Sequence, residues 1–257
     1  MILLLSPAKT LDYDTPPHVA ATDDPGFLSQ SAELIRLLKK HSADDIANLM
    51  NLSPALAELN AGRYKAWRRT FTDANSKPAV LAFNGDVYEG LDAASLKPAE
   101  LAWAQSHVAI LSGLYGVLRP LDRMQPYRLE MGTALPNPRG NTLYAFWGDT
   151  LAEHLNDRLA HERHPCIVNL ASQEYFKAVS RKALKASVVE CVFEDWKPAG
   201  YKVISFFAKR ARGLMARYAI QHRVKQPEAL QAFDSEGYAF TPQASQAQRW
   251  VFRRRLN

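Results

Sequence analysis

Met1-Ile-Leu-Leu-Leu-Ser-Pro-Ala-Lys9 begins the chain with an apolar run that stops at a Ser-Pro turn. The run is far too short to cross a membrane, and no charged segment precedes it as in a signal peptide. We therefore expect residues 2–5 to form a buried first strand. Short apolar runs predict further strands at residues 79–83, 108–111, 166–170, 188–193 and 202–206, the last two joined by a hairpin turn at Pro198-Ala-Gly200.

Between these runs, apolar residues recur with helical spacing. Ser42 and Ser53 are placed to cap two helices, and Pro54 suits the first position of the second one. The predicted helices begin near residues 27, 43 and 54 and continue with residues 98–107, 147–159, 172–179 and 208–223. Their order matches neither a Rossmann fold nor a TIM barrel. We predict a mixed α/β fold, a single domain over residues 1–257 with a central sheet wrapped by helices.

Positive charge is concentrated toward the end of the chain. The net charge is +6, and residues 197–226 contain eight Lys or Arg and no Asp or Glu. On a wheel of the predicted helix 208–223, an apolar arc of Phe207, Ala211, Leu214, Met215 and Tyr218 lies opposite Lys209, Arg210, Arg212, Arg217 and Arg223. A solvated helix surface would mix both signs of charge, so this face favours a polyanion, although an ordinary surface or a membrane surface remains an alternative.

Two further basic groups support phosphate binding. The predicted helix that begins at Ser53 carries Arg63, Lys65, Arg68 and Arg69. Leu111-Ser-Gly-Leu-Tyr-Gly-Val117 resembles the hairpin of a helix-hairpin-helix module, with Gly113 and Gly116 exposing backbone N–H groups, although a plain strand-to-loop turn explains it equally well. Arg119, Arg123 and Arg128 follow. Binding of this kind should be independent of sequence and should weaken steeply with salt.

An enzyme is the alternative function. Ser6 has Lys9 three residues later, but Pro7 disfavours the helix that a Ser-Lys nucleophile pair requires. Ser6, Lys9, Arg128 and Glu130 could instead form a pocket for a nucleotide or nucleobase. Other polar residues at expected strand ends could join this pocket or simply cap helices and turns, namely Asn84, Asp86, Asn169, Ser172 and Glu174.

Neither a metal nor a cofactor is expected. His161 and His164 are the nearest approach to a ligand cluster, and we interpret them as solvated residues at a helix end. Cys166 and Cys191 lie in strand-like apolar runs, where a free thiol behaves as a small hydrophobic side chain.

Several motifs in order along the chain carry a resemblance to a known family. They are Leu5-Ser-Pro-Ala-Lys-Thr-Leu-Asp12, Phe83-Asn-Gly-Asp-Val-Tyr88, residues 111–122, Met124-Gln-Pro-Tyr-Arg-Leu-Glu-Met-Gly132, Phe146-Trp-Gly-Asp149, Asn169-Leu-Ala-Ser172, Glu174-Tyr-Phe-Lys177, Ile204-Ser-Phe206, Ala208-Lys-Arg-Ala-Arg-Gly-Leu-Met215 and Phe233-Asp-Ser-Glu-Gly-Tyr238. With these motifs the chain resembles the YaaA family of bacterial peroxide-stress proteins. It departs from the family at Asn84, where Lys is expected, and at Gln173, where Asp is common.

The resemblance implies a cytoplasmic protein that protects cells from hydrogen peroxide and limits damage driven by unincorporated iron. It also implies binding of duplex or irregular DNA in a positively charged cleft with a helix-hairpin-helix-like element, and no firmly attached catalytic activity. We accordingly expect DNA as the partner of a monomer without membrane contact. Direct iron sequestration is the weakest hypothesis, because no ligand cluster supports it.

The expected nucleic-acid contacts come from all of these segments. They are Lys9, Arg63, Lys65, Arg68, Arg69, Gly113, Gly116, Arg119, Arg123, Arg128, Lys177, Lys209, Arg210, Arg212 and Arg217.

Overall fold

Strand β1 (Ile2–Leu5) lies in the middle of an eight-stranded sheet in the computed structural model, which describes residues 1–255. All four of its side chains are buried. A strand buried on both faces has a continuous apolar run rather than an alternating pattern, which is why Ile-Leu-Leu-Leu suits this position. The first predicted strand is confirmed.

The rest of this sheet comes from later parts of the chain. Its strands are β5 (Val108–Ser112), β6 (Gly116–Leu118), β8 (Cys166–Asn169), β9 (Ser187–Lys197), β10 (Gly200–Lys202), β11 (Ala239–Phe240) and β12 (Arg249–Arg254). The order is β11-β12-β9-β8-β1-β5-β6, with β10 paired to β9. β1 is parallel to β5 and β8, and β9 is parallel to β8 and β12, whereas β6, β10 and β11 pair antiparallel. The predicted mixed α/β fold with a central sheet flanked by helices is confirmed.

Helices and two small sheets surround this central sheet. The helices are α1 (Leu28–Leu38), α2 (Ala43–Met50), α3 (Pro54–Ala66), α4 (Ala79–Ala82), α5 (Asp86–Leu91), α6 (Pro98–His107), α7 (Leu143–Trp147), α8 (Thr150–Arg158), α9 (Gln173–Phe176) and α10 (Ser205–Gln221). The 3₁₀ helices are η1 (Ala93–Ser95), η2 (Pro227–Ala232), η3 (Ser235–Gly237) and η4 (Pro242–Ala244). β2 (Thr10–Leu11) pairs with β4 (Phe83–Asn84), and β3 (Lys77–Pro78) pairs with β7 (Arg123–Met124).

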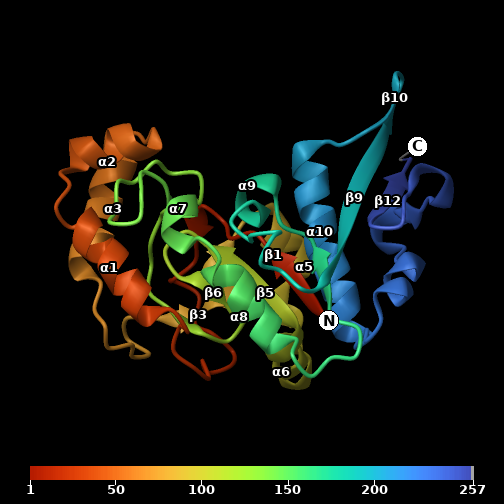
Figure 1. The fold of residues 1–257 in the computed structure, drawn as a ribbon, viewed down its shortest axis with the longest axis horizontal. Helices are drawn as coiled ribbons and strands as arrows, with labels where there is room; N and C mark the ends of the chain where they lie inside the picture. Colours follow the sequence, from red (N-terminus) through yellow and green to blue (C-terminus); the bar gives the residue numbers. More distant parts are fainter. Residues whose placement is uncertain (256–257) are drawn as a thin grey trace.

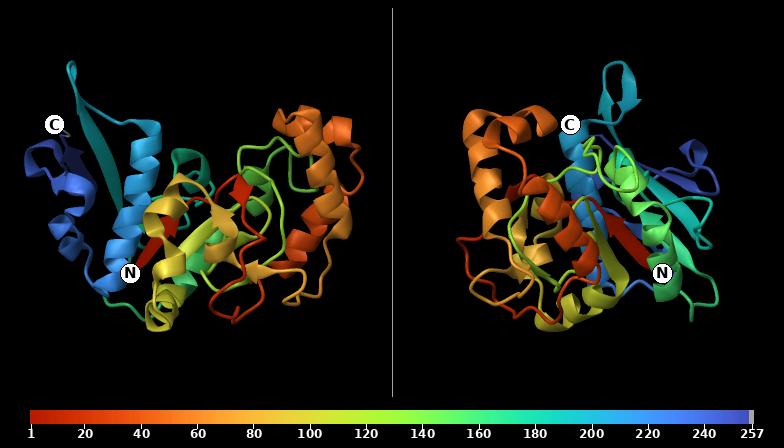
Figure 2. Two further views of the ribbon diagram at one scale, coloured as in Figure 1. Left: turned by 180° about the vertical axis from the view of Figure 1, so that it is seen from behind. Right: turned by 60° about the vertical axis from the view of Figure 1, so that its left-hand side comes forward.

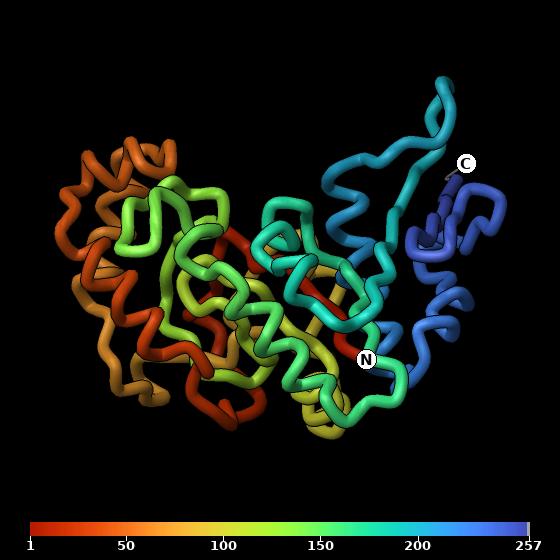
Figure 3. The backbone as a smooth tube through the Cα atoms, viewed as in Figure 1, coloured from red at the N-terminus to blue at the C-terminus, as the bar shows by residue number. Residues whose placement is uncertain are grey.

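The elements form two groups on either side of β1 (Figure 1). α1, α2 and α3 gather at one end of the molecule, and α10, β9 and β12 at the other, as the view from behind in Figure 2 also shows. The tube in Figure 3 places the orange segment that contains α1, α2 and α3 opposite the blue C-terminal part. We call the first group the α3 arm (residues 28–66) and the second the α10 arm (residues 187–254).

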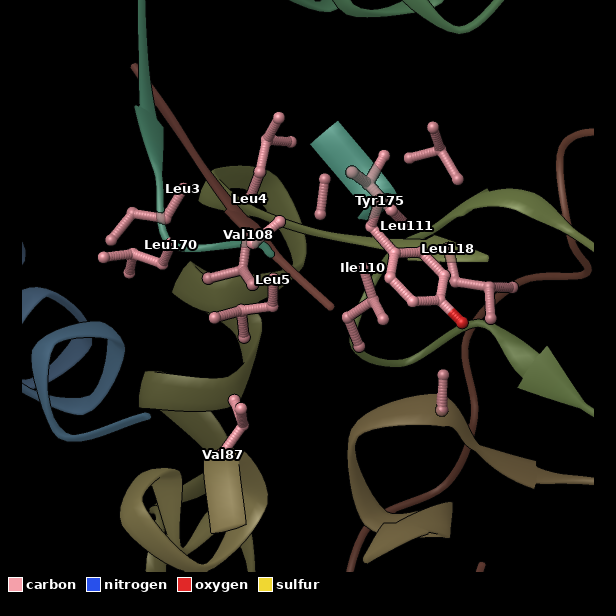
Figure 4. Close-up of a cluster of buried hydrophobic side chains, with 14 of the residues drawn as sticks. Leu3, Leu4, Leu5, Val87, Val108, Ile110, Leu111, Leu118, Leu170 and Tyr175 are labelled. Atoms are coloured by element: carbon pink, nitrogen blue, oxygen red, sulfur yellow. The ribbon is translucent and has the colours of Figure 1, made fainter. Parts of the chain in front are cut away.

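The core around β1 fixes the end of that strand. Figure 4 shows Leu3, Leu4 and Leu5 near Val108 of β5, and all four side chains are at most 1% exposed. Burying such a side chain contributes about 1.5–3 kcal/mol each, so the position of the strand end is firmly set. Tyr175 of α9 belongs to the same buried cluster, which ties the core to the segment described below as the candidate site.

Helix α10 lies against α5 at very short range. A Cβ atom added to Gly213 would lie 1.8 Å from the carbonyl oxygen of Val87, and one added to Gly90 would lie 2.2 Å from the carbonyl oxygen of Arg210. No side chain fits at either position, so glycine allows the two backbones to touch. The buried face of α10 otherwise consists mainly of alanines, at positions 208, 211, 216 and 219.

This contact explains why the predicted apolar stripe of α10 is partly wrong. Ala211 and Met215 are buried as expected, but Phe207, Leu214 and Tyr218 are only half-buried. Small residues occupy the contact with α5, so the large side chains lie at its margins. The helix also begins at Ser205, within the segment 202–206 for which the sequence predicts a strand.

The observed secondary structure also differs from the predicted one in two apolar runs. Residues 79–83 form helix α4 followed by β4, because the periodicity of so short a run cannot distinguish a helix from a strand. The predicted helix 147–159 is interrupted at Gly148, whose φ of 49° ends α7 before α8 begins. The predicted starts of α2 and α3 are confirmed, with Ser42 and Ser53 as their N-caps.

No helix-hairpin-helix element forms at Gly113 and Gly116. β5 and β6 pair antiparallel there, with Ser112 opposite Gly116, so the segment is a β-hairpin. Both glycines are buried, and a Cβ atom on Gly113 would lie 2.3 Å from the carbonyl oxygen of Leu129. The plain turn that the sequence allowed is correct, because the apolar residues around the glycines belong to the sheet.

Two features are absent from residues 1–255. No helix there has the length and apolar character needed to span a membrane. No three His, Cys, Asp or Glu side chains of the same residues are grouped so that they could hold a metal ion.

Candidate functional site

The candidate site lies where β1 and β8 end. The chain leaves β1 and next enters this sheet at β5, on one side of β1, whereas it leaves β8 for β9, on the other side. In open sheets with parallel strands, a crevice forms at the carboxyl ends of two strands whose connections diverge in this way, and ligands bind in it. Ser6 follows β1 directly, and Ser172 follows β8 after two residues.

A cavity of about 430 Å³ opens at this position. Its lining includes three cations and three carboxylates, which come from five separate segments of the chain. These charged residues are Lys9, Asp86, Glu130, Glu174, Lys209 and Arg212. Of the polar residues expected at strand ends, Asn84, Asp86, Ser172 and Glu174 line the cavity, whereas Asn169 faces a different hollow beyond α9.

Two serine hydroxyls meet on the floor of this cavity. The Ser6 hydroxyl accepts a hydrogen bond from the Ser172 backbone N–H at 2.8 Å and donates to the Ser172 hydroxyl oxygen at 3.4 Å. The carbonyl oxygen of Ser6 accepts a hydrogen bond from the Tyr88 hydroxyl at 3.0 Å. Ser172 also caps α9, so the capping role and the pocket role that the sequence allowed are both present.

Glu130 brings the other enzyme candidates together. Its carboxylate lies 2.8 Å from the Lys9 ammonium and 3.0 Å from the Arg128 guanidinium. Lys9 is therefore engaged with Glu130, whereas Ser6 is hydrogen-bonded to Ser172. Three of the four predicted residues line the cavity and the fourth, Arg128, contacts it through Glu130. Lys9, Arg128 and Glu130 therefore form an ion-paired group, and Ser6 and Lys9 do not form a nucleophile dyad.

The cations of α10 are arranged in a way that the sequence did not predict. Lys209 lies 3.8 Å from Asp86, Arg210 lies 2.7 Å from Glu236, and Arg217 lies 3.6 Å from Asp92. These carboxylates come from α5, the residue after it, and η3. The stretch 197–226 lacks acids, but the tertiary structure supplies them to these three of its eight cations.

Arg212 is the exception on this helix. Its side chain is half-buried and lines the cavity, and among residues 1–255 it has no ion pair or hydrogen bond. Burial lowers the pKa of its guanidinium, with the charge of Glu190 opposing that effect. The wheel placed Arg212 on the outer face, but the helix is oriented so that it faces inward.

Two other predicted cations belong to loop networks. Arg119 pairs with Asp23 and Asp122, both at 3.0 Å. Arg123 lies 3.6 Å from Asp24 and 3.8 Å from Asp73. These contacts join the early acidic loop to the segment after β6, which gives both arginines a structural role.

The cations at the end of α3 are mostly exposed. Lys65, Arg68 and Arg69 have no carboxylate within ion-pair distance in the described part of the chain, and the Arg68 guanidinium donates only to the backbone carbonyls of Lys65, Ala66 and Trp67. Arg63 is half-buried and donates to the Asn60 side chain at 3.3 Å. Lys39 and Lys40, directly after α1, are exposed as well. We call these five residues, Lys39, Lys40, Lys65, Arg68 and Arg69, the α3 cluster.

Sequence reasoning missed Lys39 and Lys40. They follow α1, and the Lys39 ammonium donates to the carbonyl oxygen of Trp67 at 3.2 Å, which places it beside Arg68. The two consecutive lysines at a helix end were the available signal. Lys177, also predicted as a contact, is exposed after α9 and lies over the ring of Tyr144.

Comparison with known proteins gives consistent matches over the whole chain. A family model described as peroxide stress protein YaaA matches residues 1–244. A UPF0246 protein of Bordetella petrii is 68% identical over 255 residues, which is 99% of this chain and 100% of that protein. UPF0246 proteins of Bordetella avium and Paracidovorax citrulli are 65% and 64% identical, each over at least 99% of both chains.

Proposed function

The chain belongs to the YaaA family of peroxide stress proteins, and from that premise we propose that it acts in this response by binding DNA phosphates, without reading sequence. The observation that carries the proposal is the α3 cluster, in which five cations lack a carboxylate partner among the described residues. Exposed Lys and Arg side chains gain affinity from DNA by displacing its condensed counterions.

The α10 cations take a secondary part in this proposal. Lys209, Arg210 and Arg217 would have to exchange a carboxylate for a phosphate, so each contributes less to affinity than an unpaired cation. Lys177 has no carboxylate partner in residues 1–255 and is exposed directly after α9. DNA that touches the α3 cluster and α10 together would pass over the carboxyl ends of β1 and β8.

The salt dependence of DNA affinity tests the proposal. Lys65→Ala with Arg69→Ala removes two exposed, unpaired cations and should leave the fold intact. If both contact phosphates, the slope of log K against log salt becomes shallower by about 0.9 for each lost contact. Fluorescence anisotropy with a labelled duplex, measured over a range of salt concentrations, gives this slope.

A matched variant separates position from net charge. Lys97→Ala with Arg163→Ala also removes one Lys and one Arg that are exposed and unpaired within residues 1–255. Lys97 precedes α6, which lies away from α3 in Figure 1, and Arg163 is in the loop after α8. This control should keep the wild-type slope. Equal slopes for all three proteins, or a flat wild-type response, would show that the α3 cluster binds no DNA.

A second function is supported by the cavity. Ser6, Lys9 and Glu130 line one space at the diverging ends of β1 and β8, where parallel sheets hold small ligands. We propose that the protein also acts on a nucleotide or nucleobase there, with Glu130 held in place by Lys9 and Arg128.

Glu130→Gln tests this second function separately. The change removes the carboxylate charge from the cavity but none of the proposed phosphate contacts. We expect it to abolish protection in a peroxide survival assay while DNA affinity stays at least as high as in the wild type. Full protection by Glu130→Gln, at normal protein levels, would rule out a role for the cavity in peroxide resistance.

A further inference from the structure

Only one charged group of the cavity lining lacks a partner in the described chain. Glu130 is paired with Lys9 and Arg128, Asp86 with Lys209, and Glu174 accepts a hydrogen bond from the Gly132 backbone N–H at 2.9 Å. The guanidinium of Arg212 has neither an ion pair nor a hydrogen bond among residues 1–255. Every carboxylate of the cavity lining therefore has a partner among the described residues, whereas the Arg212 guanidinium has none.

Leaving Arg212 in this state is unfavourable. A half-buried guanidinium has lost part of its water shell, and a buried charge is normally compensated by an opposite charge or by hydrogen bonds. Glu190, on β9, acts on it electrostatically but lies beyond ion-pair distance. An anion entering the cavity would supply the missing partner, and the planar fork of arginine is suited to two oxygens of a phosphate or carboxylate.

A hydroxyl donor is also available in the cavity. The Ser172 hydroxyl oxygen accepts from the Ser6 hydroxyl at 3.4 Å and from the Tyr175 backbone N–H at 3.4 Å. Its own proton has no acceptor among the described residues, so it is free to donate to a ligand. Arg212 and Ser172 belong to the α10 arm and to the end of β8, and both line the same space.

We propose that this cavity binds a small organic anion, whose phosphate or carboxylate group contacts the Arg212 guanidinium and the Ser172 hydroxyl. A volume of about 430 Å³ lies in the range of pockets for small molecules, so there is room for more than an inorganic ion. The inference deepens the second function proposed above, since it names the charge that the ligand of that pocket carries. It is independent of DNA binding by the α3 cluster.

Calorimetric titration with defined probes tests the inference. Inorganic phosphate, adenosine 5′-monophosphate and malonate present the anionic group in different forms, and adenosine lacks it. We expect an anionic probe to bind the wild type and adenosine not to bind. Binding of the nucleotide but not malonate would identify a phosphate ligand, and the reverse a carboxylate ligand.

Variants of Arg212 provide the second part of the test. Arg212→Gln should weaken binding by about tenfold or more, the effect of losing a charge-assisted hydrogen bond. Arg212→Lys keeps the charge without the fork, and we expect an intermediate affinity, which covers the case in which Arg212→Gln does not fold. Arg163→Gln is the matched control: it removes an exposed arginine beside Glu162, which pairs with the Met1 ammonium at the other end of β1.

Two results would overturn the inference: no binding of any anionic probe to the wild type, or equal binding to the wild type and both Arg212 variants. The outcome is distinguishable from that of the second function. If an anion binds through Arg212 but Glu130→Gln protects fully against peroxide, the anion site exists but the cavity has no role in peroxide resistance. If Glu130→Gln loses protection and no anion binds, only the inference about the ligand fails.

Discussion

Asp12 connects two parts of the chain through a single carboxylate. It accepts hydrogen bonds from the backbone N–H groups of Asp14 at 3.0 Å and Thr15 at 2.9 Å, and it lies 3.5 Å from the ammonium of Lys77, which is only 6% exposed. The hydrogen bonds from Thr15, followed by the charge of Lys77, lower the pKa of Asp12 from 3.8 to about 2. A carboxyl with a lowered pKa stabilises the folded state only while it is ionised.

We predict that this contribution disappears in acid. It is fully present above the unfolded pKa of 3.8 and is lost as the pH falls through about 2. Asp12→Asn should therefore lower the melting temperature at neutral pH, and its difference from the wild type should shrink below pH 3.8. Thermal melts over a pH series measure this. Asp14→Asn, at an exposed neighbour with no ion pair in the described residues, should change little; a difference for Asp12→Asn that is the same at every pH would refute the assignment.

Single residues also show which roles can be predicted from the sequence. Ser42 and Ser53 could be recognised as helix caps because a cap and the N–H group that it accepts from are only a few residues apart. The partners of the α10 cations could not, because Asp86, Asp92 and Glu236 reach them only through the tertiary fold. Absence of acids from a segment of sequence therefore does not mean that its cations are unpaired.

Among the contacts between elements, that of α5 with α10 leaves no room for a side chain at Gly213 or Gly90. Gly213 lies at the point where a Cβ atom would meet the Val87 carbonyl oxygen and two further backbone atoms of α5. We predict that Gly213→Ala destabilises the protein by about 1–3 kcal/mol, the usual cost of overpacking, or prevents folding. Urea denaturation followed by circular dichroism measures the effect.

Gly62→Ala is the control for that prediction. Gly62 lies within α3, and a Cβ atom added there would meet no side chain or neighbouring element within 4 Å. The same substitution should there stabilise the helix, by roughly 0.5–1 kcal/mol, because alanine is the better helix former. If both variants lose the same stability, close packing is not the reason for Gly213.

The elements that were predicted correctly are those with strong local signals. α1 has helical periodicity, α2 begins after its Ser42 cap, α6 begins with Pro98, and β1 and β8 are dense apolar runs. Residues 79–83 carry no such signal, and the two glycines at 113 and 116 suit a hairpin of strands as well as one of helices. Tertiary contacts decided both cases.

At the scale of the whole molecule, charge is distributed differently from its distribution in the sequence. The stretch 197–226 holds eight Lys or Arg and no acid, yet three of these cations are ion-paired and one faces the cavity. The α3 cluster has fewer residues in any one segment but brings together the ends of two helices. The pocket residues, in contrast, were foreseen in part, because side chains after parallel strands converge at one edge of a sheet.

The position of β1 has a consequence for the order in which the protein can fold during synthesis. During synthesis β1 emerges well before its hydrogen-bonding partners, since Leu3 pairs with Val108 and Val168. Pairings so distant in sequence require long loops to close first, which slows folding. Until residue 168 has emerged, the nascent chain exposes an apolar strand without its second neighbour, and unpaired apolar strands of this kind are prone to aggregation.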